Sequence, residues 1–329
     1  KIKMQNYIFK RILLIIPNVM LVSFVITVLM RLIPGSTVDA MLAGAGADVD
    51  LDRKKLEMKL GLDVSLPHYW ARWVGIAKDT NGNYNGLLQG NLGTSIWQKE
   101  PVTKLLSKYW PVTLEIGILG LIMAQLIALP IGIISALRQD TWGDYLARSF
   151  AILLISIPSF WVATLAILIP VVAFDYMPPL RFIHLHQDVW GNLKMVLAPS
   201  FILGMALSGI TMRMTRTTML EVLRQDYIRT AWSKGLTEKV IATRHALKNA
   251  LIPVVSIIGI QLPVLIGGTV IIEQIYSLPG MGRLIISACL RRDYTLVTGI
   301  MFVYAIVLML INLITDLTYT YLDPKVKYK

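Results

Sequence analysis

The chain of 329 residues is 55% hydrophobic and only 16% charged, and it carries a formal net charge of +12. A typical soluble domain is roughly 45–50% apolar and about 25% charged, so this composition excludes an ordinary soluble enzyme and also a disordered chain. The basic excess alone is compatible with nucleic acid, an anionic membrane surface or an acidic partner. The single cysteine, Cys289, excludes an internal disulfide framework.

Six long apolar stretches contain no Asp, Glu, Lys or Arg. They are residues 12–30, 116–137, 149–174, 195–212, 249–272 and 294–315. A membrane-spanning helix needs about 20 predominantly apolar residues, and each stretch is long enough. The first stretch lacks the small-residue cleavage site of a signal peptide, so we interpret it as a retained span. The sequence therefore predicts an all-α polytopic membrane protein with six transmembrane helices.

The basic residues predict the orientation of these helices. The N-terminus, the 138–148 loop, the 213–248 loop and the C-terminal tail hold 17 Lys and Arg, whereas the 175–194 and 273–293 loops hold 2 and 3. Basic residues in short loops favour the cytoplasmic side, so both termini are expected in the cytoplasm. The predicted segments are residues 1–33 (N-terminus and first span), 34–110 (extracytoplasmic segment), 111–316 (spans two to six, with the 213–248 loop) and 317–329 (cytoplasmic tail).

The 213–248 loop is predicted to form two helices joined by a glycine turn. Apolar residues in its first half share one helix face, at Leu220, Leu223, Tyr227 and Ala231. Gly235 suits a left-handed C-cap, and Thr237 suits the N-cap of a second helix with Glu238 in its first turn. By periodicity alone, the loop could be an amphipathic connector that lies on an anionic leaflet.

Residue patterns in this loop resemble the membrane-spanning permease subunits of bacterial ABC importers. The family motif is Glu-Ala-Ala, three residues, Gly, nine residues, Ile-x-Leu-Pro, and Ala231, Gly235 and Leu247 match it at the right spacing. The leading Glu, the Ile and the Pro are not matched. The first permease of the oligopeptide, dipeptide and nickel branch is similar in these departures, with Arg-Thr-Ala, here 229–231, and Arg-His-Ala-Leu-Lys, here 244–248.

The resemblance covers nearly the whole chain. Further stretches similar to this branch are 31–36 (RLIPGS), 90–95 (GNLGTS), 101–102 (PV), 111–114 (PVTL), 157–160 (IPSF), 276–282 (YSLPGMG), 292–294 (RDY) and 323–325 (DPK). Each match is short, but their order and spacing agree with the branch. The resemblance implies the type I ABC importer permease fold.

The resemblance also implies a role for the loop. In the family, this loop forms a short coupling helix that docks in a groove on the ATP-hydrolysing subunit, a role that falls here on about 227–236. The candidate coupling residues are Tyr227, Arg229, Thr230, Ala231, Lys234, Gly235, Leu236, His245 and Leu247. Gly235 is expected to let the two helices of the loop meet closely.

Other candidate residues lie in or near the fifth span. Gln261, Pro263, Gly267 and Gly268 are candidate pathway or hinge residues, although glycines in a span also allow close helix packing. Glu273 and Arg283 lie near external ends of helices and are candidate contacts for a binding protein. His184 and His186 are two residues apart in an external loop, where the commoner case is exposure to solvent, and no metal site is predicted.

The sequence also bears on the energy source. The spans contain no charged residue, which argues against a proton relay or an ion-coupled carrier. The chain has no Gly-x-x-x-x-Gly-Lys-Ser/Thr loop and no catalytic motif, so we expect no catalytic residue and no cofactor, with ATP and Mg²⁺ bound by partner subunits. A six-span secondary transporter or channel acting as a homodimer and, less favoured, an intramembrane enzyme stay open as alternatives.

By resemblance, the chain is expected to be the permease subunit of a bacterial inner-membrane importer for short peptides. The implied partners are a second homologous permease subunit, two ATP-binding subunits, an extracytoplasmic substrate-binding protein and membrane lipid. Nickel chelates, glutathione and glycosides stay open as cargo. The basic excess is explained by the inner face of the membrane and does not require nucleic acid.

Overall fold

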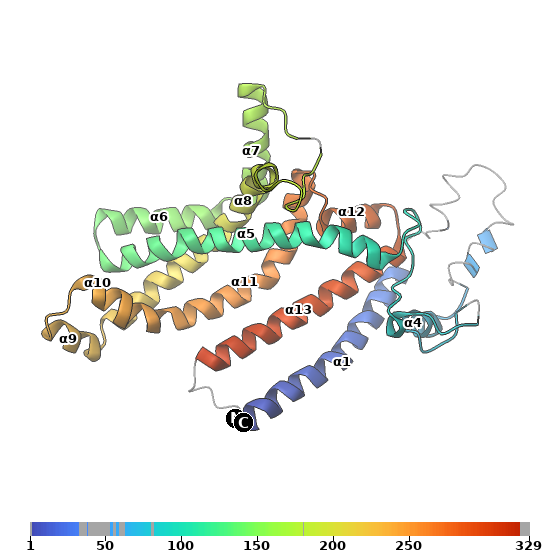
Figure 1. Cartoon of the computed structure of the whole chain (residues 1–329), viewed down its shortest axis with the longest axis horizontal. Helices are drawn as coiled ribbons and strands as arrows, with labels where there is room; N and C mark the ends of the chain where they lie inside the picture. The colour runs from blue at the N-terminus through green and yellow to red at the C-terminus, as the bar shows by residue number, and fades with distance from the viewer. Residues whose placement is uncertain are drawn as a thin grey trace. The chain divides into compact units, whose positions relative to one another are not determined.

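The computed structural model describes residues 2–32, 38, 53–54, 57–58, 63–79, 82–179 and 181–322. Its elements in chain order are α1 (Ile2–Leu32), α4 (Leu66–Val74), the short 3-10 helix η1 (Leu87–Gln89), α5 (Val102–Leu137), α6 (Trp142–Ser156), α7 (Ser159–Phe174), α8 (Val189–Leu223), α9 (Asp226–Ser233), α10 (Glu238–Val240), the π-helix η2 (Ile241–Ala246), α11 (Leu247–Ile275), α12 (Met281–Leu290) and α13 (Tyr294–Leu322) (Figure 1). The predicted all-α class is confirmed for the described residues.

Five of the six charge-free stretches each lie within one long helix. These helices are α1, α5, α8, α11 and α13, and each is long and apolar enough to cross a membrane. Many of their apolar side chains face outward, such as Leu126, which is 69% exposed. Outward apolar side chains are expected where lipid, rather than water, surrounds a helix.

The third charge-free stretch differs from a single straight helix. It is divided into α6 and α7, which meet at 90° and together form a sixth span if the pair crosses the membrane as one. Ile157 has extended backbone angles (φ −83°, ψ 122°) and Pro158 is the N-cap of α7. The residue before a proline is disfavoured in the helical region, which explains the break.

The chain divides into two compact units. Unit 1 comprises residues 1–111 and 283–310, and unit 2 comprises residues 112–282 and 311–329. The helices α5, α12 and α13 contribute residues to both units. The functional ranges expected from the sequence stay predictions.

In unit 1, Asp293 joins two of the stretches that carry the family resemblance. Its carboxylate accepts hydrogen bonds from the Ser95 hydroxyl (2.6 Å) and the Ile96 backbone N–H (3.1 Å). It also accepts a hydrogen bond from the Leu296 N–H (3.1 Å) at the start of α13. The Trp97 indole N–H donates to the Arg291 carbonyl (2.8 Å) beside it. These hydrogen bonds therefore connect the 90–95 stretch to the 292–294 stretch.

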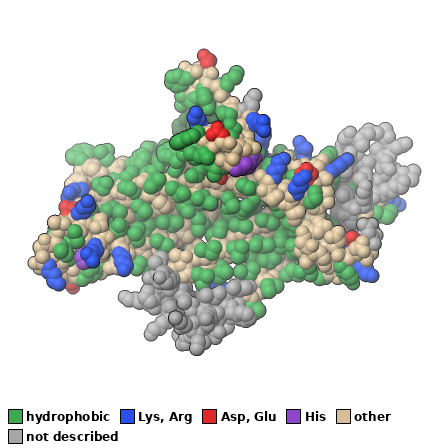
Figure 2. Space-filling view, viewed as in Figure 1, with side chains coloured by type: hydrophobic (Ala, Val, Ile, Leu, Met, Phe, Trp, Pro, Cys, Tyr) green, Lys and Arg blue, Asp and Glu red, His purple; other side chains and the backbone are tan. Residues whose placement is uncertain are grey.

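In unit 2, α8 contacts α6, α7 and α11 (Figure 1). Small residues permit this close packing, since a Cβ on Gly204 would meet the backbone of Gly120 and Ala124 on α5. A Cβ on Gly209 would likewise meet the Ala151 carbonyl on α6. Figure 2 shows Lys and Arg side chains gathered at the end of unit 2 that carries α9 and α10, with hydrophobic side chains along its long helices.

Candidate functional site

The predicted coupling segment includes a separate short helix, α9, which follows α8. Gln225 is its N-cap, and Asp226 lies in the first turn, where a negative charge is favourable. Ile228 and Ala231 are buried in a cluster that also contains Met219 of α8. The other six residues of α9 are exposed. The helix is therefore anchored by one narrow apolar face and presents the rest of its surface to solvent.

The structure corrects the helix face predicted for this segment. α8 ends at Leu223 and α9 begins at Asp226, so the stripe predicted over 220–231 is interrupted. Tyr227 is 39% exposed, whereas Ile228 is fully buried. The break changes the rotation of the second helix, and the buried position moves by one residue.

The turn after α9 depends on the backbone of Gly235. Its φ angle is +76°, so the predicted left-handed conformation is confirmed. Its N–H donates to the Trp232 carbonyl (2.9 Å), and the Leu236 N–H donates to the Ala231 carbonyl (3.4 Å). Apart from Gly235 itself and its two chain neighbours, no described residue has an atom within 4 Å of a Cβ built on Gly235. The expectation that Gly235 lets two helices meet closely is therefore wrong, and the backbone angle explains the glycine instead.

The second arm of the loop contains a π-helix that the sequence analysis does not predict. Thr237 is the N-cap of α10, as predicted, but its side chain makes no capping hydrogen bond. The π-helix η2 follows over Ile241–Ala246, and Ile241 and Ala246 join the cluster that holds Ile228. A π-helical turn holds an extra residue, and apolar spacing over so short a segment does not reveal it.

Tyr227 joins the two arms of the loop. Its hydroxyl accepts a hydrogen bond from the Asn249 side-chain amide (2.7 Å) in the first turn of α11. The same hydroxyl donates to the His245 carbonyl at 3.4 Å. α9 is thus attached to the start of α11 by polar contacts as well as by the apolar cluster.

The structure divides the nine candidate coupling residues into two groups. The exposed ones are Tyr227, Arg229, Thr230, Lys234 and Gly235, and the others are Ala231, Leu236, His245 and Leu247, which are buried or half-buried. The sequence analysis did not select Asp226, Trp232 or Ser233, which are also exposed on α9, and Trp232 is 49% exposed. If Ile228 and Ala231 had been assigned to the buried face of one short helix, these three residues would have been predicted to be exposed on its other faces.

The candidate pathway residues lie on α11, which runs as one helix through Pro253 and Pro263. The Gln261 side chain is buried and donates to the Leu207 carbonyl (3.2 Å) and the Thr211 hydroxyl (3.1 Å) on α8. This placement favours a role in packing α11 against α8. Gly267 is exposed and has open space around a Cβ position, whereas a Cβ on Gly268 would lie 2.9 Å from the Leu203 side chain.

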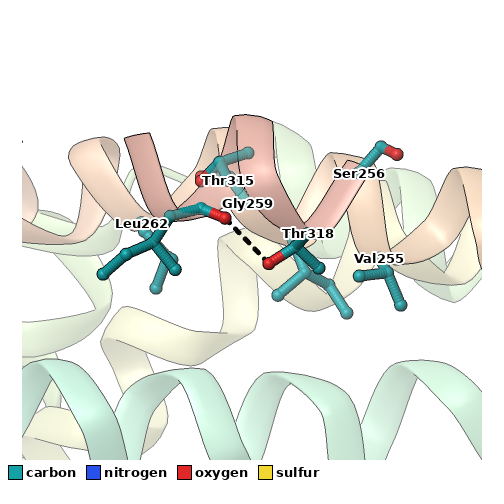
Figure 3. A pocket seen from close by; sticks show the side chains of 8 residues that line it. Val255, Ser256, Gly259, Leu262, Thr315 and Thr318 are labelled. Carbon is teal, nitrogen blue, oxygen red and sulfur yellow. Dashed lines mark hydrogen bonds between the residues drawn. The ribbon is translucent and has the colours of Figure 1, made fainter. Parts of the chain in front are cut away.

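A cavity of about 130 Å³ lies in unit 2 between α11 and the last turns of α13 (Figure 3). Gly259 and Leu262 line one side of it, and Ile314 and Thr315 line the other. The Thr315 hydroxyl donates to the Gly259 carbonyl (3.5 Å) and to the Ile311 carbonyl (2.9 Å). Ligand pockets usually measure about 300–1,000 Å³, so this apolar cavity does not offer a peptide site.

Glu273, a candidate contact for a binding protein, is fully buried at the end of α11. Its carboxylate accepts a hydrogen bond from the Thr113 hydroxyl (2.7 Å), which in turn accepts one from the Met281 N–H (2.7 Å). A Cβ on Gly280 would collide with the same carboxylate. These contacts favour a structural role, since the carboxylate is not accessible to a partner. Arg283, the other candidate contact, is exposed.

Tyr276, the C-cap of α11, lies three residues after Glu273. Burial raises the pKa of the Tyr276 phenol above its ordinary value of 10.0. Elsewhere in unit 2, the rings of His184 and His186 stack with centroids 5.4 Å apart. In the part of the chain that the structure describes, no three His, Cys, Asp or Glu residues are grouped so that they could hold a metal ion.

The fold is shared with a solved transporter subunit. A chain in an inward-facing structure of the MetNI methionine ABC transporter superposes with a TM-score of 0.53 at 17% sequence identity, over 67% of this chain and 97% of that one. At this identity, the likeness establishes the fold and nothing about cargo.

Sequence comparison extends the relationship over the whole length. The dipeptide transport system permease protein DppB of Alkalihalophilus pseudofirmus is 35% identical over 349 aligned residues, which cover 99% of this chain and 100% of that protein. The glutathione transport system permease protein GsiC of Pectobacterium atrosepticum is 33% identical over 326 residues, with the same coverage. Residues 128–328 match the family described as binding-protein-dependent transport system inner membrane component. The chain belongs to this family of inner-membrane transport components.

Proposed function

We propose that this chain is the membrane-spanning permease subunit of an ATP-driven importer for short peptides. The observation that carries the proposal is its full-length similarity to dipeptide and glutathione permeases. Glutathione is itself a small peptide, so both cargoes belong to one chemical class. Nickel and glycosides are less favoured because these relatives are named as dipeptide and glutathione permeases.

The geometry of α9 supports the coupling part of this proposal. α9 exposes charged, polar and aromatic side chains at the end of unit 2, while Ile228 and Ala231 fix it to the helices behind it. A short helix fixed by its apolar face presents its charged, polar and aromatic side chains for contact with another protein. The basic residues of the 213–248 loop favour the cytoplasmic side for α9, and the same count favours the cytoplasmic side for both termini.

The proposal assigns the chemistry of energy supply to other subunits. The chain lacks a phosphate-binding Gly-x-x-x-x-Gly-Lys-Ser/Thr loop, so ATP and Mg²⁺ would be bound and ATP hydrolysed by two partner ATPase subunits. A second homologous permease would complete the translocation path, and an extracytoplasmic binding protein would deliver the peptide. This chain then contributes the path and the coupling surface and is not itself an enzyme.

Reconstitution of the importer tests the proposal. The chain is purified with its partner permease and ATPase subunits, placed in proteoliposomes and supplied with the binding protein. We expect short peptides to stimulate ATP hydrolysis and to be taken up, and a nickel chelate or a glycoside to do neither. Uptake driven by an imposed ion gradient without ATP would contradict the proposal and favour a secondary transporter.

A further inference from the structure

A buried carboxylate lies at the end of unit 2 that carries α9. Asp144, in the first turn of α6, is fully buried. Both its oxygens accept hydrogen bonds from the Arg216 guanidinium, from Nε and from Nη2, each at 2.7 Å. The Ser135 hydroxyl (2.5 Å) and the Asp140 backbone N–H (3.0 Å) also donate to it. Arg148 is a further ion-pair partner at 3.5 Å.

These contacts bring together three helices. Ser135 belongs to α5, Asp144 to α6 and Arg216 to α8. A bidentate guanidinium–carboxylate pair has a fixed planar geometry, so it restrains the relative position of its two helices more strongly than a single hydrogen bond does. Removing one partner from a buried pair leaves an uncompensated charge, and the remaining structure must then shift or admit water.

Arg216 lies close to the coupling helix along the same stretch of chain. α8 continues from Arg216 to Leu223 without a Gly or Pro, and α9 begins at Asp226. At a rise of about 1.5 Å per residue, the guanidinium-bearing turn is about 10 Å from the end of α8. A displacement of α9 is passed to α8 across the break at residues 224–225 and through the buried cluster that holds Ile228 and Met219, and it then reaches Arg216 along an uninterrupted part of α8.

The loop between α5 and α6 also contacts the other arm of the coupling loop. The Arg138 guanidinium donates to the Glu238 carboxylate at 3.2 Å, and these side chains are 63% and 40% exposed. The Arg224 guanidinium reaches the Gln139 side-chain oxygen at 3.5 Å. Exposed ion pairs of this kind contribute little and are screened by salt, so this contact can separate at low cost.

We propose that Asp144 is a positioning residue for energy coupling. It holds α5, α6 and α8 together as one rigid group, so that a movement of α9 shifts all three helices, while the exposed contact from Arg138 to Glu238 allows the second arm to part from them. The inference rests on the proposed function, because it requires α9 to be moved by an ATPase partner. It adds the loop between α5 and α6 and the start of α6, which the sequence analysis used only to predict orientation, to the coupling apparatus.

The test compares peptide transported with ATP hydrolysed by the complete importer in proteoliposomes. Asp144→Asn keeps the side-chain shape and removes the charge, and we expect it to lower the number of peptides carried per ATP by about tenfold, as for loss of a buried charged hydrogen bond. Arg216→Lys keeps the charge but loses the bidentate geometry, and we expect about a fivefold decrease. Asp175→Asn makes the same substitution at an exposed carboxylate outside this apparatus, so it is the matched control and should change the ratio by less than about twofold.

The ratio separates coupling from stability. A purely structural role would lower the yield of assembled complex and leave the ratio of the assembled fraction unchanged. If the complex with Asp144→Asn does not assemble, Arg216→Lys and Ser135→Ala are used instead. A wild-type ratio of peptide transported to ATP hydrolysed in both of these variants overturns the inference. Wild-type importer whose ATP hydrolysis does not respond to peptide would instead contradict the proposed function.

Discussion

Gly235 shows how one residue can be required for its backbone and not for its size. Its φ of +76° lies in the left-handed region, which costs most residues roughly 1–2 kcal/mol because Cβ approaches the carbonyl oxygen. Space around it is open. Asparagine visits this region more readily than other non-glycine residues, and β-branched residues avoid it.

We therefore expect an order of effects at Gly235 that follows backbone preference. Gly235→Val should nearly abolish peptide uptake while membrane insertion stays normal, Gly235→Ala should be intermediate, and Gly235→Asn should retain most uptake. Uptake is measured per amount of inserted protein. Equal loss in all three variants would mean that the added side chain blocks a docking partner, and the backbone explanation would be abandoned.

The same region shows what a residue pattern can predict. The left-handed turn at Gly235 was predictable because glycine after a helical stretch has a local cause. The exchange of Tyr227 for Ile228 as the buried residue was not, since it depends on where α8 ends. Ile228 and Met219 belong to one buried cluster although they lie on different helices, so the burial of Ile228 depends on tertiary packing.

At the scale of elements, glycines in different helices have different roles. Gly204 on α8 faces the backbone of α5, and an added methyl group there has no flexible neighbour that could move aside. Gly267 on α11 has open space around its Cβ position. Both lie inside helices, where alanine is favoured over glycine by about 1 kcal/mol when nothing else changes.

We expect Gly204→Ala to destabilise the protein by about 1–3 kcal/mol through overpacking. Gly267→Ala should leave its stability unchanged or raise it by up to about 1 kcal/mol. Thermal unfolding in detergent compares the two. A lower melting temperature for Gly267→Ala would mean that the added methyl group collides with a neighbour, contrary to the open space around this Cβ position. Reduced uptake at unchanged stability would support the hinge role predicted for that glycine.

α9 offers a second matched pair, since one short helix carries both an anchor and an exposed aromatic side chain. Trp232→Ala should weaken binding of the ATPase subunit by about tenfold or more, as expected for an aromatic residue at the centre of an interface, without changing thermal stability. Ile228→Ala should cost about 2–5 kcal/mol of stability because the side chain is fully buried. ATPase binding to purified permease complex distinguishes them. Normal binding by Trp232→Ala would exclude this side chain from the docking surface.

Helix existence was more predictable than helix continuity. Charge-free stretches of about 20 residues need a membrane or a large core, so α1, α5, α8, α11 and α13 could be expected from composition alone. Pro158 is itself a local signal for the helix break, but the uninterrupted apolar stretch around it led to the prediction of a single helix. The π-helix over Ile241–Ala246 had none, since its extra residue is accommodated by packing against α8 and α9.

At the scale of the whole molecule, the bent pair α6 and α7 decides the topology. If the pair crosses the membrane, the loops before and after it lie on opposite sides, and the 213–248 loop with its eight basic residues lies in the cytoplasm. If the pair enters and leaves on the same side, every later loop changes sides, and those basic residues face outward. The positive-inside rule favours the crossing.

Single cysteines in a Cys289→Ser background test this topology. We expect His186→Cys to react with a membrane-impermeant maleimide in intact spheroplasts, and Gln139→Cys and Thr243→Cys to react only after permeabilisation. All three positions are exposed, so lack of reaction reports the side of the membrane and not burial. Reaction of Gln139→Cys and His186→Cys from the same side would show that α6 and α7 form a re-entrant loop. α9 would then lie outside the cell, beyond the reach of an ATPase, and both the orientation and the coupling role proposed for it would have to be given up.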